Sequence, residues 1–277
     1  MKRIITAIML MACVCEAQIP DSTMMWLRQA GVGTAASVAV GWADPMTYAT
    51  YWNMETTNAT STLDVSGNNV SATNIPNMAT GASWKILATN QYGRVSHNYY
   101  FGGTNQRFAT ASHILTGATL TVGCWIYPNE VTSVKSFVNK WQWTSPGGWY
   151  LGNFHAGAQR ITFAVDNGNH NGGQSAESGN ILIATNWQSV VGVFSNATIN
   201  LYYNGVIVNT TTSAVGGLPT VLLTNSCPID IGYFQGVGRY MAGNIDEAFI
   251  SSQAWTPNQI AAWHTNTIPT NNIRIYP

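Results

Sequence analysis

Residues 186–211 have the pattern of three consecutive β-strands joined by two turns, and this stretch constrains the fold more than any other. The first strand, residues 187–194, has apolar side chains on both alternating faces, which is typical of a strand covered on both sides. The second, residues 198–203, alternates polar with apolar side chains, as a strand with one buried face does. Asn204-Gly205 then favours a type I′ turn, after which residues 206–208 pair back. A chain organised around this meander is predicted to be a β-sandwich.

Short strand-like segments recur on both sides of the meander. We expect them at residues 47–54, 98–103, 118–128, 136–141, 148–154, 160–168, 228–234 and 243–251. A short helix is predicted to open at Thr256 and to run through Trp263, with Pro257 suited to its first turn. Many short strands with almost no helix predict an all-β fold, a two-sheet antiparallel β-sandwich with a short C-terminal helix.

The composition limits the partners of the chain. Charged residues make up 8% of the sequence and the formal net charge is zero, whereas an ordinary soluble domain has roughly 25% charged residues. No basic patch is available to neutralise phosphates, so nucleic acid is excluded as an expected partner. A neutral surface rich in Asn, Thr, Ser and aromatic groups suits neutral ligands such as glycans, and equally suits packing into an assembly.

Residues 1–17 are predicted to be an export signal. A basic start precedes an apolar run over residues 4–14, and Cys15-Glu16-Ala17 places small residues at the −3 and −1 positions of a cleavage site. The alternative is a lipoprotein signal, because the residues before Cys13 resemble a lipobox. No apolar run reaches the ~18 residues that a membrane-spanning segment needs. We therefore expect a secreted or cell-surface protein without a transmembrane segment, anchored by lipid at Cys13 in the alternative.

After removal of the signal, two cysteines remain, Cys124 and Cys227. An exported protein can pair them in a disulfide. Each also lies in an apolar strand-like run, where a free thiol acts as a small apolar side chain. The sequence leaves both alternatives open.

The ordered set of segments resembles one family. Its most specific parts are the strand and turn INLYYNG at residues 199–205 and the ending GNIDEAFISSQAWTPNQIAAW at residues 243–263. With the strands before them, from about residue 47 to residue 264, they resemble the laminin-G-like jellyroll domain of the concanavalin A-like lectin and glucanase superfamily. The resemblance implies a jellyroll of two curved sheets, and binding or adhesion far more often than catalysis. The predicted domains are a signal peptide at residues 1–17, an N-terminal extension of unknown function at 18–46, the jellyroll at 47–265 and a tail at 266–277.

The enzymatic branch of this superfamily works through a Glu-x-Asp-x-x-Glu strand, and its two carboxylates must lie about 5–5.5 Å apart for a retaining mechanism. The present sequence contains no Glu-x-Asp. Asp246 and Glu247 are neighbours, so on a strand they point to opposite faces and cannot act as a pair. We therefore expect a protein that is not an enzyme.

Members of the superfamily often carry a structural Ca²⁺ near the edge of a sheet. Asp64 and Asp246 resemble positions near which such ions are found, and hard cations take six to eight oxygen ligands. The alternative is that both carboxylates cap turns or bond to backbone. Calcium is therefore an expectation that the sequence leaves open.

Carbohydrate sites place aromatic faces beside amide or carboxylate groups. Trp141, Gln142 and Trp143 form one such group, and a second lies at Tyr233, Gln235, Arg239 and Tyr240. Trp149 and Tyr150 lie in a predicted strand and are expected in the core.

The function expected from these features is a non-catalytic extracellular binding module that recognises carbohydrate or adheres through the loops of a jellyroll. Its partner is then a carbohydrate or a surface protein. The alternative is a structural or adhesion component of a cell surface or virus particle, in which copies of the fold self-assemble. A glycoside-active enzyme is the second alternative, disfavoured by the missing carboxylate motif.

Overall fold

The computed structural model describes part of the chain, residues 50–52, 61–62, 72–74, 83–89, 95–103, 106–110, 117–142, 147–166, 168, 174–212, 217–223, 225–234 and 238–267. The chain divides into two units, residues 1–45 and 46–277, and every described residue belongs to the second. The predicted export signal, the N-terminal extension and lipidation at Cys13 lie outside the described residues, so the predicted domain limits stay a prediction.

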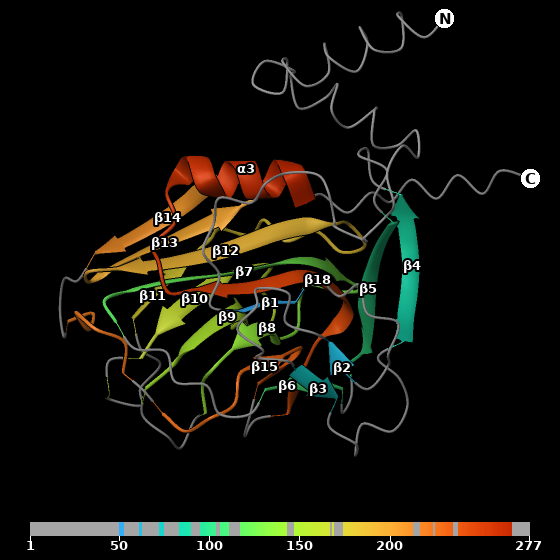
Figure 1. The fold of residues 1–277 in the computed structure, drawn as a ribbon, viewed down its shortest axis with the longest axis horizontal. Coiled ribbons are helices and arrows are strands. Elements are labelled where there is room, and N and C mark those ends of the chain that lie inside the picture. The colour runs from blue at the N-terminus through green and yellow to red at the C-terminus, as the bar shows by residue number, and fades with distance from the viewer. Residues whose placement is uncertain are drawn as a thin grey trace, which may run out of the picture. The chain divides into compact units, whose positions relative to one another are not determined.

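The described strands form two large antiparallel sheets that face each other (Figure 1). The first sheet has the order β14-β13-β12-β7-β18-β5-β4, with β1 paired to β18. Its strands are β1 (Thr50–Trp52), β4 (Ser83–Thr89), β5 (Val95–Gly102), β7 (Thr119–Pro128), β12 (Gln188–Ser195), β13 (Thr198–Tyr203), β14 (Val206–Thr212) and β18 (Ala242–Ser251).

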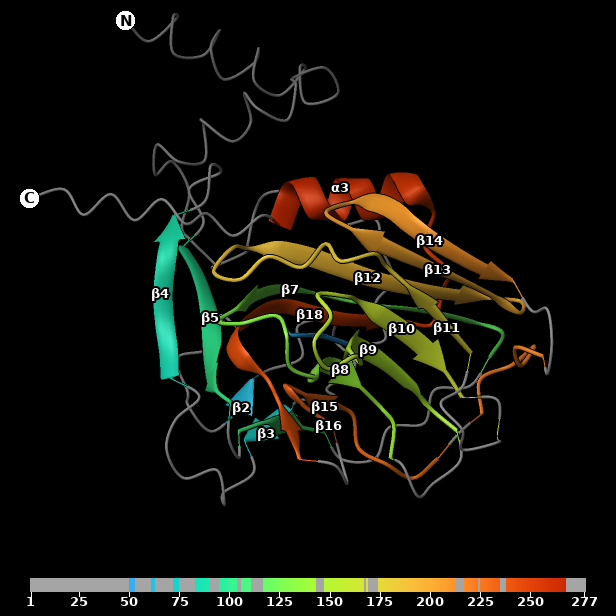
Figure 2. The same cartoon turned by 180° about the vertical axis from the view of Figure 1, so that it is seen from behind.

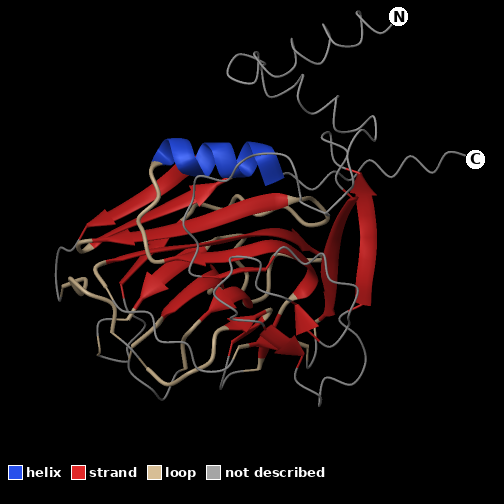
Figure 3. Cartoon of the chain, in the orientation of Figure 1, coloured by secondary structure: helices blue, strands red, loops and turns tan. Residues whose placement is uncertain are grey.

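The second sheet has the order β11-β10-β9-β8-β15-β6-β3-β2 and is seen from the other side in Figure 2. Its strands are β2 (Ser61–Thr62), β3 (Ala72–Asn74), β6 (Phe108–Ala109), β8 (Lys135–Asn139), β9 (Trp149–Asn153), β10 (Thr162–Val165), β11 (Gln174–Glu177) and β15 (Asp230–Ile231). A separate hairpin pairs β16 (Tyr233–Phe234) with β17 (Arg239–Tyr240). The predicted two-sheet antiparallel sandwich is confirmed (Figure 3).

The predicted meander is also confirmed. Strand β12 lies between β7 and β13, and β13 pairs with β14. Asn204 and Gly205 have φ values of 49° and 78°, the two positive angles that a type I′ turn requires. Strand β12 is buried at every position but its last, and Val190 and Phe194 on one of its faces belong to the core. Gly192 permits this packing, since an added Cβ would lie 2.2 Å from the ring of Phe163.

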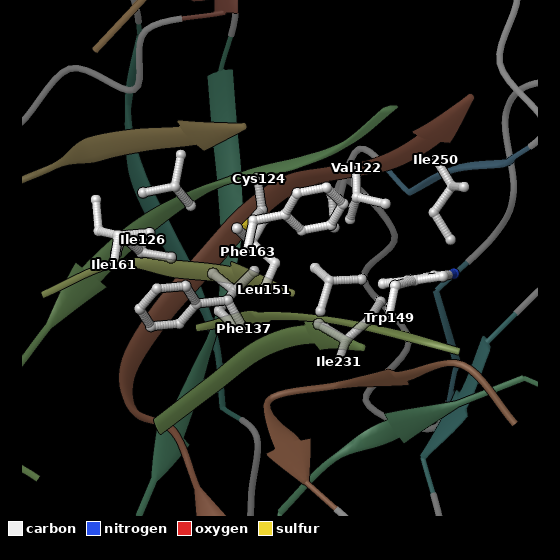
Figure 4. Close-up of a cluster of buried hydrophobic side chains, with 14 of the residues drawn as sticks. Val122, Cys124, Ile126, Phe137, Trp149, Leu151, Ile161, Phe163, Ile231 and Ile250 are labelled. Carbon is white, nitrogen blue, oxygen red and sulfur yellow. The ribbon is translucent and has the colours of Figure 1, made fainter. Parts of the chain in front are cut away.

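The core lies between the two sheets (Figure 4). Val122, Cys124 and Ile126 project from β7 toward side chains of the second sheet. Those side chains are fully or almost fully buried and include Phe137, Leu151, Ile161 and Phe163. Trp149 also lies in this core, as the sequence predicts. Each large apolar side chain buried in this way stabilises the fold by roughly 1.5–3 kcal/mol relative to exposure.

The helix α3 (Pro257–Thr267) covers the outer face of the first sheet. Its Trp263 is fully buried and lies 4.9 Å from Phe249 and 6.2 Å from Trp125, measured between ring centroids. Phe249 also stacks on Trp255 at 4.3 Å. The predicted helix is confirmed and continues one turn beyond Trp263.

The start of α3 follows a capping box. The backbone N–H of Gln259 donates to Oγ1 of Thr256 at 3.3 Å, and the backbone N–H of Thr256 donates to Oε1 of Gln259 at 2.8 Å. Pro257 occupies the first helical position, where its missing N–H leaves no bond unmade. The helix therefore begins where the sequence predicts it.

Side chains of β14 join the two sheets along one side of the sandwich. Nδ2 of Asn209 donates to the backbone oxygen of Glu177 at 2.6 Å, and Oγ1 of Thr211 donates to the backbone oxygen of Ser175 at 2.9 Å. Both acceptors lie on β11, the last strand of the second sheet. The polar side chains of β14 thus satisfy carbonyl groups that an edge strand would otherwise expose.

Cys124 and Cys227 are both buried, and the structure does not join them in a disulfide. Cys124 lies in the core, where burial raises the pKa of its thiol far above the ordinary value. Cys227 precedes β15, and its Sγ lies 3.3 Å from Oε1 of Gln142. Of the two alternatives, the structure therefore has buried thiols and not the disulfide, because core side chains enclose Cys124 whereas Cys227 faces Gln142.

Candidate ligand pocket on the second sheet

The outer face of the second sheet is built by alternation along β9, β10 and β11. Trp149 and Leu151 point into the core, so Tyr150 between them points outward. Phe163 and Val165 likewise place Thr162 and Ala164 on the outer face. Ala176 is a core residue, and its neighbours on β11 complete the outer surface.

A pocket of about 130 Å³ opens on this face. Aromatic side chains make up its apolar part, and Thr162, Ser175, His155 and Glu177 make up its polar part. Tyr150 contacts the rings of Phe154 and Phe234 edge-on, at centroid distances of 5.7 and 5.1 Å. The full lining consists of Trp141, Tyr150, Phe154, His155, Thr162, Ala164, Ser175, Glu177 and Phe234.

The floor of the pocket is rigid because Tyr150 is tied to the sheet. Its side chain is 1% exposed, and its hydroxyl reaches the backbone oxygens of Lys135 at 2.5 Å and Asn153 at 3.0 Å. Burial raises the pKa of this hydroxyl, and the charge of Arg239 offsets part of that rise. Tyr150 therefore presents a neutral ring, with its hydroxyl turned to backbone rather than to the pocket.

Thr162 gives the pocket wall a hydrogen-bonding group without a partner. The residue is 2% exposed and lines the pocket. Its Oγ1 is buried and finds no hydrogen-bond partner in the described part of the chain. Burying a hydroxyl without a hydrogen bond costs roughly 1–3 kcal/mol in proteins.

The rim carries the charged side chains. Glu177 accepts hydrogen bonds from Nε2 of His155 at 2.9 Å and from the hydroxyl of Ser175 at 3.3 Å. Nη1 of Arg160 lies 3.7 Å from the second oxygen of Glu177. These side chains are between 31% and 44% exposed, so the ion pairs contribute little to stability. Their oxygen and nitrogen atoms remain within reach of a ligand at the mouth.

The β16–β17 hairpin stands beside the pocket. Its Phe234 lines the pocket, and Arg239 on the paired strand stacks on Phe154 at 4.9 Å and on Phe234 at 5.8 Å. The other side of the hairpin stacks Tyr233 on Tyr240 at 4.7 Å. Nη1 of Arg239 is buried and has no hydrogen-bond partner among the described residues.

A buried ion pair lies under the hairpin. Nη1 of Arg107 is 3.3 Å from Oδ1 of Asp230 on β15, and the guanidinium lies 4.7 Å from the ring centroid of Tyr233. Asp230 is 1% exposed. Burial raises the pKa of its carboxyl to about 7, although the charge of Arg107 lowers it. The base of the hairpin is therefore held by a charge pair that titrates near neutral pH.

The predicted site residues are partly brought together. Trp141 lines the pocket, and Arg239 touches two of the lining rings. Tyr233 and Tyr240 lie on the opposite side of the hairpin, and Gln142 faces Cys227. Trp143 and Gln235 lie outside the described residues.

Most of the polar lining was not predicted from the sequence. His155, Thr162, Ser175 and Glu177 were not among the predicted residues, and neither was Phe154. Tyr150 is buried as expected, but it lies on the pocket side of the sheet and not in the core between the sheets. Alternation was the signal that could have found Thr162, because residues 161, 163 and 165 point inward.

The calcium prediction gains no support from the described residues. Asp64 lies outside them. Asp246 is fully buried, and one of its carboxylate oxygens accepts the backbone N–H of Glu247 at 2.8 Å. Among the described side chains, no three His, Cys, Asp or Glu residues come together as a metal site would require. Calcium binding stays a prediction.

Comparison with curated proteins finds no match. Several solved structures share the fold. Domain 4 of AbnA, an extracellular arabinanase from Geobacillus stearothermophilus in complex with arabinotriose, is 15% identical with a TM-score of 0.59, over 78% of this chain and 97% of that one. The ligand binding domain of botulinum neurotoxin serotype D in complex with N-acetylneuraminic acid is 13% identical with a TM-score of 0.58, over 79% of this chain and 51% of that one.

The binding domain of Paraclostridial Mosquitocidal Protein 1 is also similar, at 14% identity and a TM-score of 0.53, over 75% of this chain and 52% of that one. The present chain thus spans about half the length of the toxin domains. At these identities the likeness establishes the fold alone.

Within the described residues, no helix is long and apolar enough to cross a membrane. A family model described as Concanavalin A-like lectin/glucanases superfamily, Laminin_G_3, matches residues 101–261, more than half of the chain. This match runs from the end of β5 into the first half of α3. The chain therefore belongs to the laminin-G-like family of the concanavalin A-like lectin and glucanase superfamily.

Proposed function

We propose that this protein is a non-catalytic binding module that recognises saccharides through the pocket on the outer face of the second sheet. The observation that carries the proposal is the combination of aromatic rings with the buried, unpartnered hydroxyl of Thr162 in one pocket. A sugar ring offers C–H groups that pack on aromatic rings and hydroxyls that satisfy polar groups.

The size of the pocket limits what enters it. Its volume is about 130 Å³, and an apolar cavity of about 150 Å³ holds a ring of the size of benzene. The pocket therefore accepts one ring of a saccharide, and the remaining rings extend into solvent. The complexes of similar folds with arabinotriose and with N-acetylneuraminic acid support a saccharide as the ligand class.

The single carboxylate of the described lining favours binding rather than hydrolysis. Glu177 is the one carboxylate among the described lining residues, and it is bonded to His155. A glycosidase of the usual kind needs two carboxyl groups flanking the scissile bond. The sequence also lacks the Glu-x-Asp motif of the glucanase branch. We therefore assign the protein no catalytic residue. The predicted export signal agrees with a module that acts outside the cell.

A glycan array followed by isothermal titration calorimetry tests this function. Thr162→Val keeps the shape of the side chain and removes only the hydroxyl, which has no partner to lose. We expect its stability to be equal or higher and its affinity for the best saccharide to fall by roughly tenfold. Thr212→Val, an exposed threonine on β14, is the matched control. An array without hits, or equal binding by Thr162→Val, would overturn the proposal.

One observation favours the second candidate, a structural or adhesion component that self-assembles. Strand β14 ends the first sheet, and its Val206, Ile207 and Val208 are 64%, 46% and 38% exposed. Natural edge strands are commonly protected by charge or Pro, and β14 contains neither. Sedimentation analysis of the purified protein with and without Ile207→Lys tests this candidate. Assemblies that the substitution dissolves would support it, and a monomer at every concentration would refute it.

A further inference from the structure

The arginines of the described residues gather on one face of the molecule. Arg107, Arg160 and Arg239 all lie at the outer face of the second sheet, beside the pocket or under the hairpin that borders it. The chain as a whole has a formal net charge of zero and only 8% charged residues. This face therefore carries more positive side chains than the neutral surface that the composition predicts.

Two of these charges have carboxylate partners. Arg107 pairs with Asp230 at 3.3 Å, and Arg160 lies 3.7 Å from Glu177. In the described part of the chain Arg239 has no carboxylate partner, and its contacts are the faces of Phe154 and Phe234. At the pocket itself, Arg160 and Arg239 against Glu177 leave one uncompensated positive charge, before any protonation of His155.

The position of Arg239 makes this charge part of the pocket. Both rings that it covers line the pocket, and its charge acts on the hydroxyl of Tyr150 at the pocket floor. Its buried Nη1 lacks a hydrogen-bond partner among the described residues. An unpaired guanidinium on aromatic rings is arranged to bind a planar anion, because its N–H groups match the two oxygens of a carboxylate or sulfate.

A cationic ligand fits this arrangement poorly. Aromatic cages bind quaternary ammonium groups through open ring faces. Here Arg239 already lies on two of the four rings of the pocket, so a second cation would meet like charge at the same faces. The rings and the charge together therefore favour an apolar ring that carries a negative group.

We propose that the pocket selects saccharides that bear an anionic group, a carboxylate or a sulfate, and that Arg239 binds this group. The inference rests on the proposed saccharide-binding function and specifies its ligand. The sugar ring packs on Trp141 and Tyr150, its hydroxyl meets Thr162, and its anion pairs with the guanidinium at the hairpin. Glu177 does not oppose the anion because His155 and Arg160 flank it.

Matched ligand pairs test the charge preference directly. Trigalacturonic acid and its methyl ester differ at the carboxylates, and sulfated lactose and lactose differ at the sulfate. We expect the anionic member of at least one pair to bind roughly tenfold more tightly in calorimetry, because a hydrogen bond to a charged group contributes more than a neutral one. Added salt should weaken that preference, since the rim is open to solvent.

Variants assign the preference to one residue. Arg239→Gln should bring the affinity for the anionic ligand down to that for its neutral partner. Thr212→Val, the exposed control on β14, should keep the preference. Arg239→Lys retains the charge and should retain part of the preference, which separates loss of charge from loss of folding. Thermal unfolding of each variant checks the fold.

Two results separate the two proposals. If neutral and anionic members bind equally, or if Arg239→Gln leaves the preference intact in a folded protein, the inference about charge is wrong and the saccharide function stands. If no saccharide of either kind binds, the proposed function itself fails.

Discussion

The buried carboxyl of Asp230 predicts a measurable dependence of stability on pH. Its folded pKa is raised to about 7, whereas an unfolded aspartate titrates near ~3.9. The folded state therefore binds the proton more tightly, so the stabilisation is full below about pH 4 and is lost as the pH rises toward about 7. With ~1.36 kcal/mol for each pKa unit, the free energy of unfolding should fall by about 3 kcal/mol between pH 5 and pH 8.

Urea unfolding followed by tryptophan fluorescence measures this fall. Asp230→Asn cannot titrate, so its free energy of unfolding should change with pH by about 3 kcal/mol less than that of the parent protein. Arg107→Gln should shift the loss of stability to higher pH, because the charge of Arg107 lowers the pKa of Asp230. Identical pH dependence of the parent and Asp230→Asn would refute the reasoning.

Three further predictions test the fold. Gly192→Ala forces a methyl group to 2.2 Å from Phe163, so chemical denaturation should show a loss of about 1–3 kcal/mol, and an unchanged midpoint would contradict this packing. Thr256→Ala removes the cap of α3 and should cost about 1 kcal/mol in the same assay; no loss would mean that the capping box does not form. If Asp64 and Asp246 hold calcium, a chelator should lower the thermal midpoint, and an unchanged midpoint would end that expectation.

The fold was predictable because its strongest signals are local. The alternation along β12 and β13, the Asn204-Gly205 turn and the capping residues at Thr256 each determine structure within a few residues. The order of these segments was enough to recognise the sandwich. Local patterns do not say which face of a covered strand points toward the core and which points outward. This limited the prediction of the pocket.

The pocket illustrates that limit. Its lining comes from residues 141–177, on β9, β10, β11 and the segments after β8 and β9, together with Phe234 from the distant β16–β17 hairpin. Trp141 and Arg239 were found because aromatic and amide groups cluster around them. Thr162 was not found, since an ordinary threonine in a strand becomes significant only when the structure leaves its hydroxyl without a partner. Tyr150 was placed in the wrong layer, because burial alone does not distinguish the two faces of a covered strand.

Substitution of Ala164 decides whether the pocket is the saccharide-binding site. Ala164 lines the pocket and is 4% exposed. The larger side chain of leucine at this position would occupy the pocket and leave the rest of the protein surface unchanged. The decisive measurement is the affinity of Ala164→Leu and of the parent protein for the best saccharide of the array. We expect at least a roughly tenfold loss of affinity in a variant that unfolds at the same temperature as the parent protein. Equal affinity in the folded variant would mean that saccharides bind elsewhere on the molecule and that the pocket is not the site.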